Sequence, residues 1–81
     1  MNLIDQLILH FGGQSNTAHE LRNASVALYG SSKFNFDRQL IHNWQTKIKR
    51  IPWQHGELVE FATQGKITKQ QVWEAAEEAI K

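Results

Sequence analysis

Cysteine is absent from this 81-residue sequence, which excludes a disulfide, a thiolate metal site and a thiol nucleophile. Long apolar runs are missing too, because none approaches the roughly 18–20 residues that a membrane span needs. The first segment, MNLIDQLILH, has no positively charged start and carries Asp5, so it is not typical of a signal peptide. We therefore expect a cytoplasmic protein without a membrane segment.

The sequence also lacks internal repeats, low-complexity tracts and linkers, so we expect residues 1–81 to form one domain. Its apolar fraction of 41% is too high for a disordered chain. A domain of this size buries roughly 60–65% of its unfolded surface, which gives a small core. A partner or a second copy of the chain often supplies the stability that such a core lacks.

Acidic and basic residues nearly balance over the whole chain, which has a formal net charge of +1, but they are unevenly distributed. Between residues 22 and 50 there are six basic side chains and one acidic side chain, Asp37. The segments on either side carry more acidic than basic residues. This distribution favours a single surface that faces a polyanion, and chance clustering in a short sequence is the alternative.

Apolar residues recur at helical spacing along the chain and predict an all-α fold of five helices. The first helix is expected over residues 2–11. It ends at Gly12-Gly13, because glycine adopts the left-handed conformation without a steric cost. The second helix begins near Ser15. Residues 24–29 either prolong it or form a separate short helix, and a strand there is the less favoured alternative.

The third helix, predicted over residues 37–47 with Asn35 or Asp37 as its cap, is amphipathic. Its apolar stripe consists of Phe36, Leu40, Ile41, Trp44 and Ile48. Its other side carries long hydrogen-bonding side chains, and such a helix can lie in a DNA major groove. The alternative is a surface helix that happens to be polar on its outer side.

The fourth helix is expected to have Pro52 in its first turn and Gly65 as its C-cap. The fifth runs over residues 68–80 and starts at Thr68 and Gln71, which have capping-box spacing. Its apolar residues cover more than one face, so one side can pack on the domain and another on a second copy of the chain. The residues expected in such a homodimer contact are Val72, Trp73, Ala76 and Ile80.

Three stretches, HFGGQSNTAHELR, FDRQLIHNWQTKIKRIP and ATQGKIT, together resemble the small Cro-like and YdaS-like helix-turn-helix regulators of temperate phages and prophages. In that family a Gly-Gly-Gln turn leads into the first motif helix, here residues 14–21 with Ala18 as its small contact residue. The recognition helix carries an aliphatic residue three positions before a tryptophan, here Ile41 and Trp44. The resemblance covers residues 3–72 in pieces and implies a compact, lambda-repressor-like domain of five helices.

One departure from the family concerns the connection between the two motif helices. A helix-turn-helix joins its helices through a turn of about 3–4 residues, whereas residues 22–35 make this connection roughly a dozen residues too long. We interpret these residues as an insertion that leaves the two helices in their usual relation. The alternative is that the motif does not form.

The resemblance implies a transcriptional regulator, a repressor of phage or prophage type, that binds double-stranded DNA with residues 37–47 in the major groove. Base contacts are expected from Arg38, Gln39, His42 and Asn43. Phosphate contacts are expected from Gln14, Ser15, Asn16, Lys33, Lys47, Lys49 and Arg50.

Two rival functions remain open. One is a small protein-binding module, such as an antitoxin or a phage accessory protein, that uses the apolar and acidic residues 67–81. The other is an architectural DNA-binding factor of the excisionase type. We expect no enzyme, metal or cofactor, because the four histidines form no metal-binding pair and no cysteine accompanies them.

Overall fold

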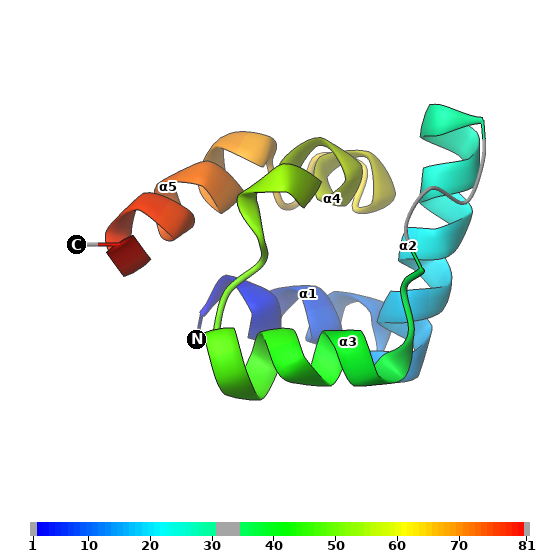
Figure 1. Ribbon diagram of the computed structural model, residues 1–81. Helices are drawn as coiled ribbons and strands as arrows, with labels where there is room; N and C mark the ends of the chain where they lie inside the picture. Colours follow the sequence, from blue (N-terminus) through cyan, green and yellow to red (C-terminus); the bar gives the residue numbers. More distant parts are fainter. Residues whose placement is uncertain (1, 31–34, 81) are drawn as a thin grey trace.

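Helices make up most of the chain in the structure, a computed structural model that describes residues 2–30 and 35–80 (Figure 1). In chain order they are α1 (Leu3–Phe11), α2 (Gln14–Tyr29), α3 (Arg38–Asn43), η1 (Trp44–Ile48), η2 (Trp53–His55), α4 (Gly56–Ala62) and α5 (Lys69–Ile80). The π-helical turn η1 continues α3, and the 3-10 turn η2 leads into α4. No strand occurs in the two described ranges, so the all-α prediction is confirmed.

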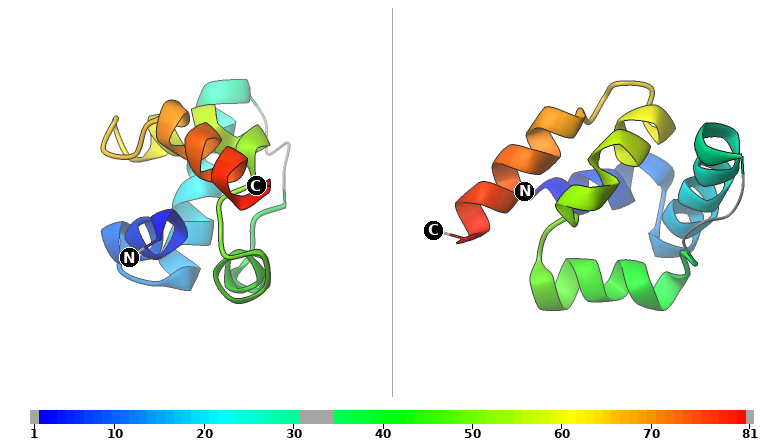
Figure 2. Two further views of the ribbon diagram at one scale, coloured as in Figure 1. Left: turned by 90° about the vertical axis from the view of Figure 1, so that its left-hand side faces the viewer. Right: turned by 45° about the horizontal axis from the view of Figure 1, so that its top comes forward.

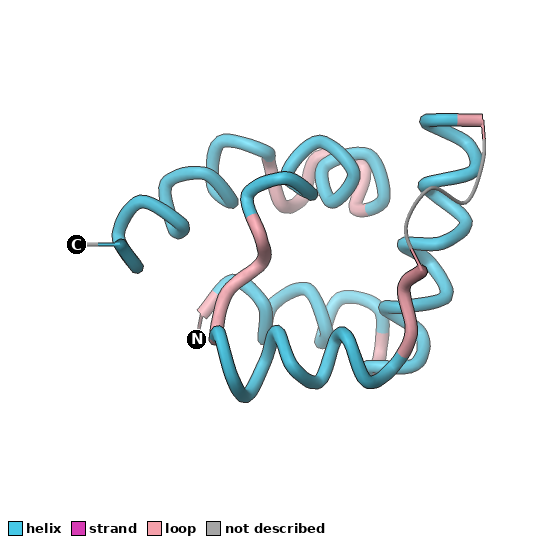
Figure 3. The backbone as a smooth tube through the Cα atoms, viewed as in Figure 1, coloured by secondary structure: helices cyan, strands magenta, loops and turns pink. Residues whose placement is uncertain are grey.

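The helices lie on two sides of a common core. α1 and α3 run in opposite directions on one side, and α2 stands across their ends (Figure 1). α4 and α5 lie on the other side, as the turned views confirm (Figure 2). The loop that follows η1 crosses from the first side to the second (Figure 3). One face of α3 therefore packs inward, and its opposite face points away from α4 and α5.

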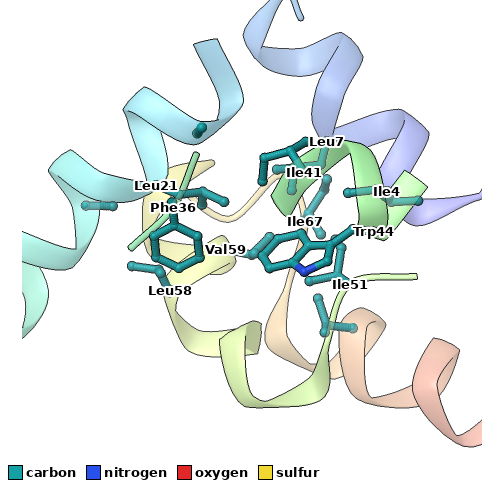
Figure 4. Close-up of a cluster of buried hydrophobic side chains, with 13 residues drawn as sticks. Ile4, Leu7, Leu21, Phe36, Ile41, Trp44, Ile51, Leu58, Val59 and Ile67 are labelled. Carbon is teal, nitrogen blue, oxygen red and sulfur yellow. The ribbon is translucent and has the colours of Figure 1, made fainter. Parts of the chain in front are cut away.

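The core draws buried side chains from all five α-helices (Figure 4). Phe36 and Trp44 meet edge to face, with 6.0 Å between their ring centroids. The ring of His55 stacks on Trp44 with a centroid distance of 5.4 Å and meets Phe36 edge-on at 5.2 Å. Because Trp44 is only 3% exposed, its predicted place in the core is confirmed.

Ile48 departs from the predicted apolar stripe, since 40% of its surface is exposed. Ile48 is the last residue of the π-helical turn η1 and directly precedes the left-handed Lys49, so it lies at the open end of the helix. The carbonyl of Trp44 accepts from the backbone N–H groups of both Lys49 and Arg50. Lys49 takes a left-handed conformation with φ of 56° to make this turn.

α2 decides among the alternatives for residues 24–29, because it is one helix from Gln14 to Tyr29. It ends at Gly30, whose φ of 78° is left-handed, and the strand alternative is wrong. Most of the predicted insertion, residues 22–29, is thus an extension of α2. Further on, the fully buried Phe36 ties the start of α3 to the core, where α2 and α3 pack on each other.

The boundaries of α4 differ from the prediction at both ends. Pro52 does not lie in the first turn of α4, because the separate turn η2 follows it and α4 begins only at Gly56. At the other end, Gln64 and Gly65 both adopt left-handed conformations, with φ of 55° and 84°. The C-cap of α4 is Thr63, so the prediction of Gly65 as the C-cap is wrong, and the two left-handed residues follow the cap.

The start of α5 confirms the predicted capping box. The backbone N–H of Thr68 donates to Gln71 Oε1 at 2.8 Å, and the backbone N–H of Gln71 donates to Thr68 Oγ1 at 3.2 Å. α5 also packs closely on α4. A Cβ atom at Gly56 would lie 2.8 Å from Trp73 Nε1, so only glycine allows this approach without a shift of the indole.

Candidate nucleic-acid interface

The outer face of α3 begins at its first turn, where Arg38 and Gln39 are exposed. Asp37 caps the helix as expected, because its Oδ1 accepts from the backbone N–H of Leu40 at 2.8 Å. One turn later, the half-buried Asn43 accepts at its Oδ1 from Gln39 Nε2 at 3.2 Å. All four residues predicted to contact bases therefore lie on α3, and two of them, Gln39 and Asn43, are hydrogen-bonded to each other.

His42, the fourth of these residues, is half-buried and turned toward α2. Its Nδ1 lies 3.2 Å from Gln14 Nε2, and because an amide nitrogen only donates, Nδ1 is the acceptor. Gln14 Nε2 also donates to Gln45 Oε1 at 2.6 Å. Gln45 Nε2 in turn donates to Asp5 Oδ1 at 2.9 Å. We call these four residues the amide bridge.

The amide bridge connects α1, α2, α3 and η1 through side chains alone. It fixes the first residue of α2 against the middle of the long helix formed by α3 and η1. Sequence reasoning missed the roles of Asp5 and Gln45 in this contact. No local signal could have revealed them, because the bonded residues lie 28 to 40 positions apart in the chain.

The N-terminus of α2 is positioned by the amide bridge. Gln14, Ser15 and Asn16 are the first three residues of this helix, and Ser15 and Asn16 are exposed. The N–H groups in the first turn of a helix have no intrahelical acceptor and carry the positive end of its dipole. Gly13 occupies the N-cap and supplies no side-chain acceptor. This end of α2 can therefore accept an anion such as a phosphate.

Basic side chains gather at the far end of the α3–η1 helix. Lys47 and Lys49 are exposed there, and Arg50 is half-buried. Lys49 adopts a left-handed conformation that ends η1, and the chain then returns to the core. The remaining predicted phosphate contact, Lys33, lies outside the described residues.

The histidines do not form a site of their own. Burial lowers the pKa of His55, which belongs to the aromatic core beside Trp44. Across the two ranges that the structure describes, no group of three histidine, aspartate or glutamate side chains is placed to hold a metal ion. In the same part of the chain, each helix is too short or too polar to span a membrane.

The predicted dimer surface is wrong at Val72, which is fully buried in the core and cannot contact a second chain. Ala76 is only 6% exposed, but it lines the groove between Trp53 and Trp73. Trp73 is 43% exposed, and its indole N–H donates to the backbone carbonyl of Trp53 at 3.2 Å. The side chain of Ile80 lies outside the described residues.

A comparison with protein-family models, with curated proteins and with solved structures finds no match to this chain. The resemblance to Cro-like and YdaS-like regulators accordingly stays a prediction that rests on the sequence. The function of the surface formed by α2 and α3 is therefore inferred from its geometry and chemistry.

Proposed function

We propose that this chain binds double-stranded DNA sequence-specifically as a transcriptional regulator, a repressor of the phage or prophage type. The observation that carries the proposal is the amide bridge. It holds the N-terminus of α2 beside a helix whose first turn exposes Arg38 and Gln39. In a helix-turn-helix, one helix contacts the DNA backbone while its neighbour enters the major groove, and this pair of elements suits that division.

Base recognition is assigned to the N-terminal half of α3. The major groove is about 12 Å wide and admits one α-helix. The guanidinium of Arg38 donates to O6 and N7 of a guanine, and the amide of Gln39 pairs with N6 and N7 of an adenine. The bond between Gln39 and Asn43 restrains the Gln39 side chain before DNA arrives, which lowers the entropy lost on binding.

Backbone contacts are assigned to both ends of this surface. The backbone N–H groups of Ser15 and Asn16, in the first turn of α2, donate to one phosphate. Lys47, Lys49 and Arg50 contact phosphates beyond the end of η1. Such contacts raise the affinity for every sequence and make binding weaken as salt increases, because bound counterions are released.

The test compares Arg38→Ala and Gln39→Ala with the unaltered chain. We expect each variant to lose about 1–3 kcal/mol of discrimination between the operator and a scrambled duplex. Salt-dependent binding to the scrambled duplex remains, since the phosphate contacts are intact. Fluorescence anisotropy over a range of salt concentrations, with an operator selected from random duplexes, measures both quantities. Gln70→Ala, which removes an exposed amide from α5, is the matched control.

Two outcomes would contradict the proposal. If both variants protect the same operator with unchanged affinity, α3 does not contact the bases. If the unaltered chain binds no duplex even at low salt, the protein-binding module becomes the better explanation. Strong bending of DNA without a preference for sequence would instead favour the architectural factor.

We also propose that the chain forms a homodimer. Trp53 and Trp73 are 60% and 43% exposed and, together with Ala76 and Glu77, they line an apolar groove of about 310 Å³. A second copy on this groove forms a two-fold dimer that binds two half-sites roughly 34 Å apart. Sedimentation equilibrium should show a dimer for the unaltered chain and a monomer for Trp53→Ser. A monomer at every concentration in the unaltered chain would contradict it.

A further inference from the structure

A second surface feature lies between α2 and α4. A hollow of about 580 Å³ is lined by residues that include Leu28, Glu57 and Phe61. A neighbouring hollow of about 390 Å³ is lined by residues that include Glu20 and Phe61. Phe61 and Gln64 line both hollows, so the hollows adjoin, and we call the two together the α2–α4 groove.

The two walls of the α2–α4 groove have the spacing of a helix-binding surface. α2 contributes Glu20, Ala24 and Leu28, which lie four residues apart on one face of that helix. α4 contributes Glu57 and Phe61, with the same spacing. A helical stretch of this length measures about 12 Å, which accommodates roughly two turns of a bound helix.

The lining of the α2–α4 groove includes exposed apolar side chains. Phe61 is 47% exposed and Leu28 38% exposed, and Ala24 and Ala27 line the second of the two hollows beside Phe61. Large apolar side chains that stay exposed in a concave surface favour a partner that covers them. An amphipathic helix that lays its apolar face into such a groove is a recurring mode of recognition.

The rim of the α2–α4 groove is acidic. Glu20 and Glu57 are exposed and Glu60 is half-buried, all three among the lining residues. Lys69 is the basic residue in the lining, and its Nζ lies 5.7 Å from the ring centroid of Trp73, so its charge is directed toward that indole. The complementary partner therefore carries positive charge on both sides of its apolar face.

We propose that the α2–α4 groove binds a basic amphipathic helix of a partner protein. The helix places two or three aliphatic side chains on Phe61 and Leu28, and its lysines or arginines pair with Glu20 and Glu57. α4 lies on the opposite side of the molecule from α3 (Figures 1 and 2). The partner therefore leaves the face of α3 free, and this site stands independently of the proposed DNA binding.

The experiment uses the full chain and two synthetic peptides of about 14 residues with leucine at helical spacing. One peptide carries lysine and the other glutamate at every remaining position. We expect the lysine peptide to bind and the glutamate peptide not to bind, as measured by fluorescence anisotropy. Amide chemical shifts should then change at Leu28, Phe61 and Gln64.

Three variants localise the site, and their altered side chains are all exposed, so the fold should persist. Phe61→Ala, and the double charge reversal Glu20→Lys with Glu57→Lys, should each weaken binding of the lysine peptide on the order of tenfold. Glu74→Lys reverses an exposed charge on α5 and is the matched control, so it should leave the affinity within about twofold.

Four outcomes would overturn the proposal. They are equal binding of the two peptides, unchanged affinity in both groove variants, shifts centred on Trp53 and Trp73, and no binding of the lysine peptide at millimolar concentration. None of these outcomes depends on whether the chain binds DNA, so the two proposals fail or survive separately.

Discussion

His55 shows how one side chain can lose its ordinary chemistry through its neighbours. It is the last residue of the turn η2, which begins at the exposed Trp53. Its ring nevertheless stacks on Trp44 and meets the edge of Phe36. Burial in this aromatic setting disfavours the protonated imidazole and lowers its pKa from the ordinary value of 6.5. At the residue scale, the half-buried His55 therefore contributes an aromatic ring that packs against the core.

The free energy of unfolding should depend on pH through His55. The folded chain holds the lower pKa, so the unfolded chain binds more protons as the pH falls below 6.5. Stability from the neutral ring is present above that pH and decreases on acidification through the folded pKa. Urea unfolding at about pH 7.5 and about pH 5 measures the change. His55→Phe keeps an aromatic ring and should reduce this dependence.

The other titrating groups are common to both proteins, so the difference between their pH profiles isolates His55. A profile of His55→Phe that superimposes on that of the unaltered chain would mean that the buried imidazole does not contribute.

Individual residues were predictable from the sequence where their role is local. Trp44 was placed in the core by its spacing to Phe36 and Ile41, and all three are buried. Gln14 and Gln45 could not be paired in the same way, because 31 positions separate them. Long-range side-chain bonds depend on how helices pack, and a periodicity argument contains no information about that.

At the scale of elements, the end of the α3–η1 helix combines strain with a proposed function. Lys49 is one of two non-glycine residues with positive φ in the described chain. A left-handed conformation costs an ordinary residue roughly 1–2 kcal/mol. The same residue holds an exposed ammonium at the proposed phosphate-binding end. The π-helical turn therefore presents a basic residue at a cost to stability.

Substitutions of Lys49 should separate its backbone strain from its contact with a DNA phosphate. Lys49→Gly relieves the strain and should raise the free energy of unfolding by about 0.5–1 kcal/mol, after the entropy of glycine is included. Lys49→Ala removes the same charge but keeps the strained conformation, so it is the matched control. Both variants should lower the salt dependence of DNA binding by about 0.9 in the logarithmic slope. Chemical denaturation and anisotropy measure the two quantities.

Equal stability of the glycine and alanine variants would contradict the assignment of strain to Lys49. An unchanged salt dependence in both would remove Lys49 from the phosphate contacts.

Helix ends were predicted correctly where a neighbouring side chain sets them. The capping box of Thr68 and Gln71 and the cap at Asp37 are confirmed, because each bond spans only three residues. The start of α4 was wrong. It begins at Gly56, where the absence of a Cβ atom admits the indole of Trp73 from α5. That boundary depends on packing between two helices. A prediction based only on the position of Pro52 therefore placed the start of the helix too early.

At the scale of the whole molecule, the exposed charges of α3 and η1 differ in sign from those that border the α2–α4 groove. The α3 side exposes Arg38, Lys47 and Lys49, whereas Glu20 and Glu57 border the α2–α4 groove. This uneven charge distribution orients the chain, because a polyanion attracts the basic surface and repels the acidic one. It also lets a protein partner occupy one side while DNA occupies the other.

The number and type of helices were predictable, but their assembly was not. Helical periodicity indicated five helices, and the resemblance suggested that residues 22–35 form an insertion. The structure describes residues 22–29 as two more turns of α2, with Leu28 and Tyr29 partly exposed. Whether a stretch of moderate polarity extends a helix depends on what it packs against, and here α4 provides that contact.

The most direct test of the proposed DNA binding is an amide chemical-shift map of the chain titrated with a mixed-sequence duplex at low salt. We expect the largest changes at Ser15, over residues 38–43 and at Lys49. The resonances of the α2–α4 groove should stay in place. Changes confined to α5 or to the groove, or no changes at all, would contradict the assignment of α3 and the N-terminus of α2 as the surface that binds DNA.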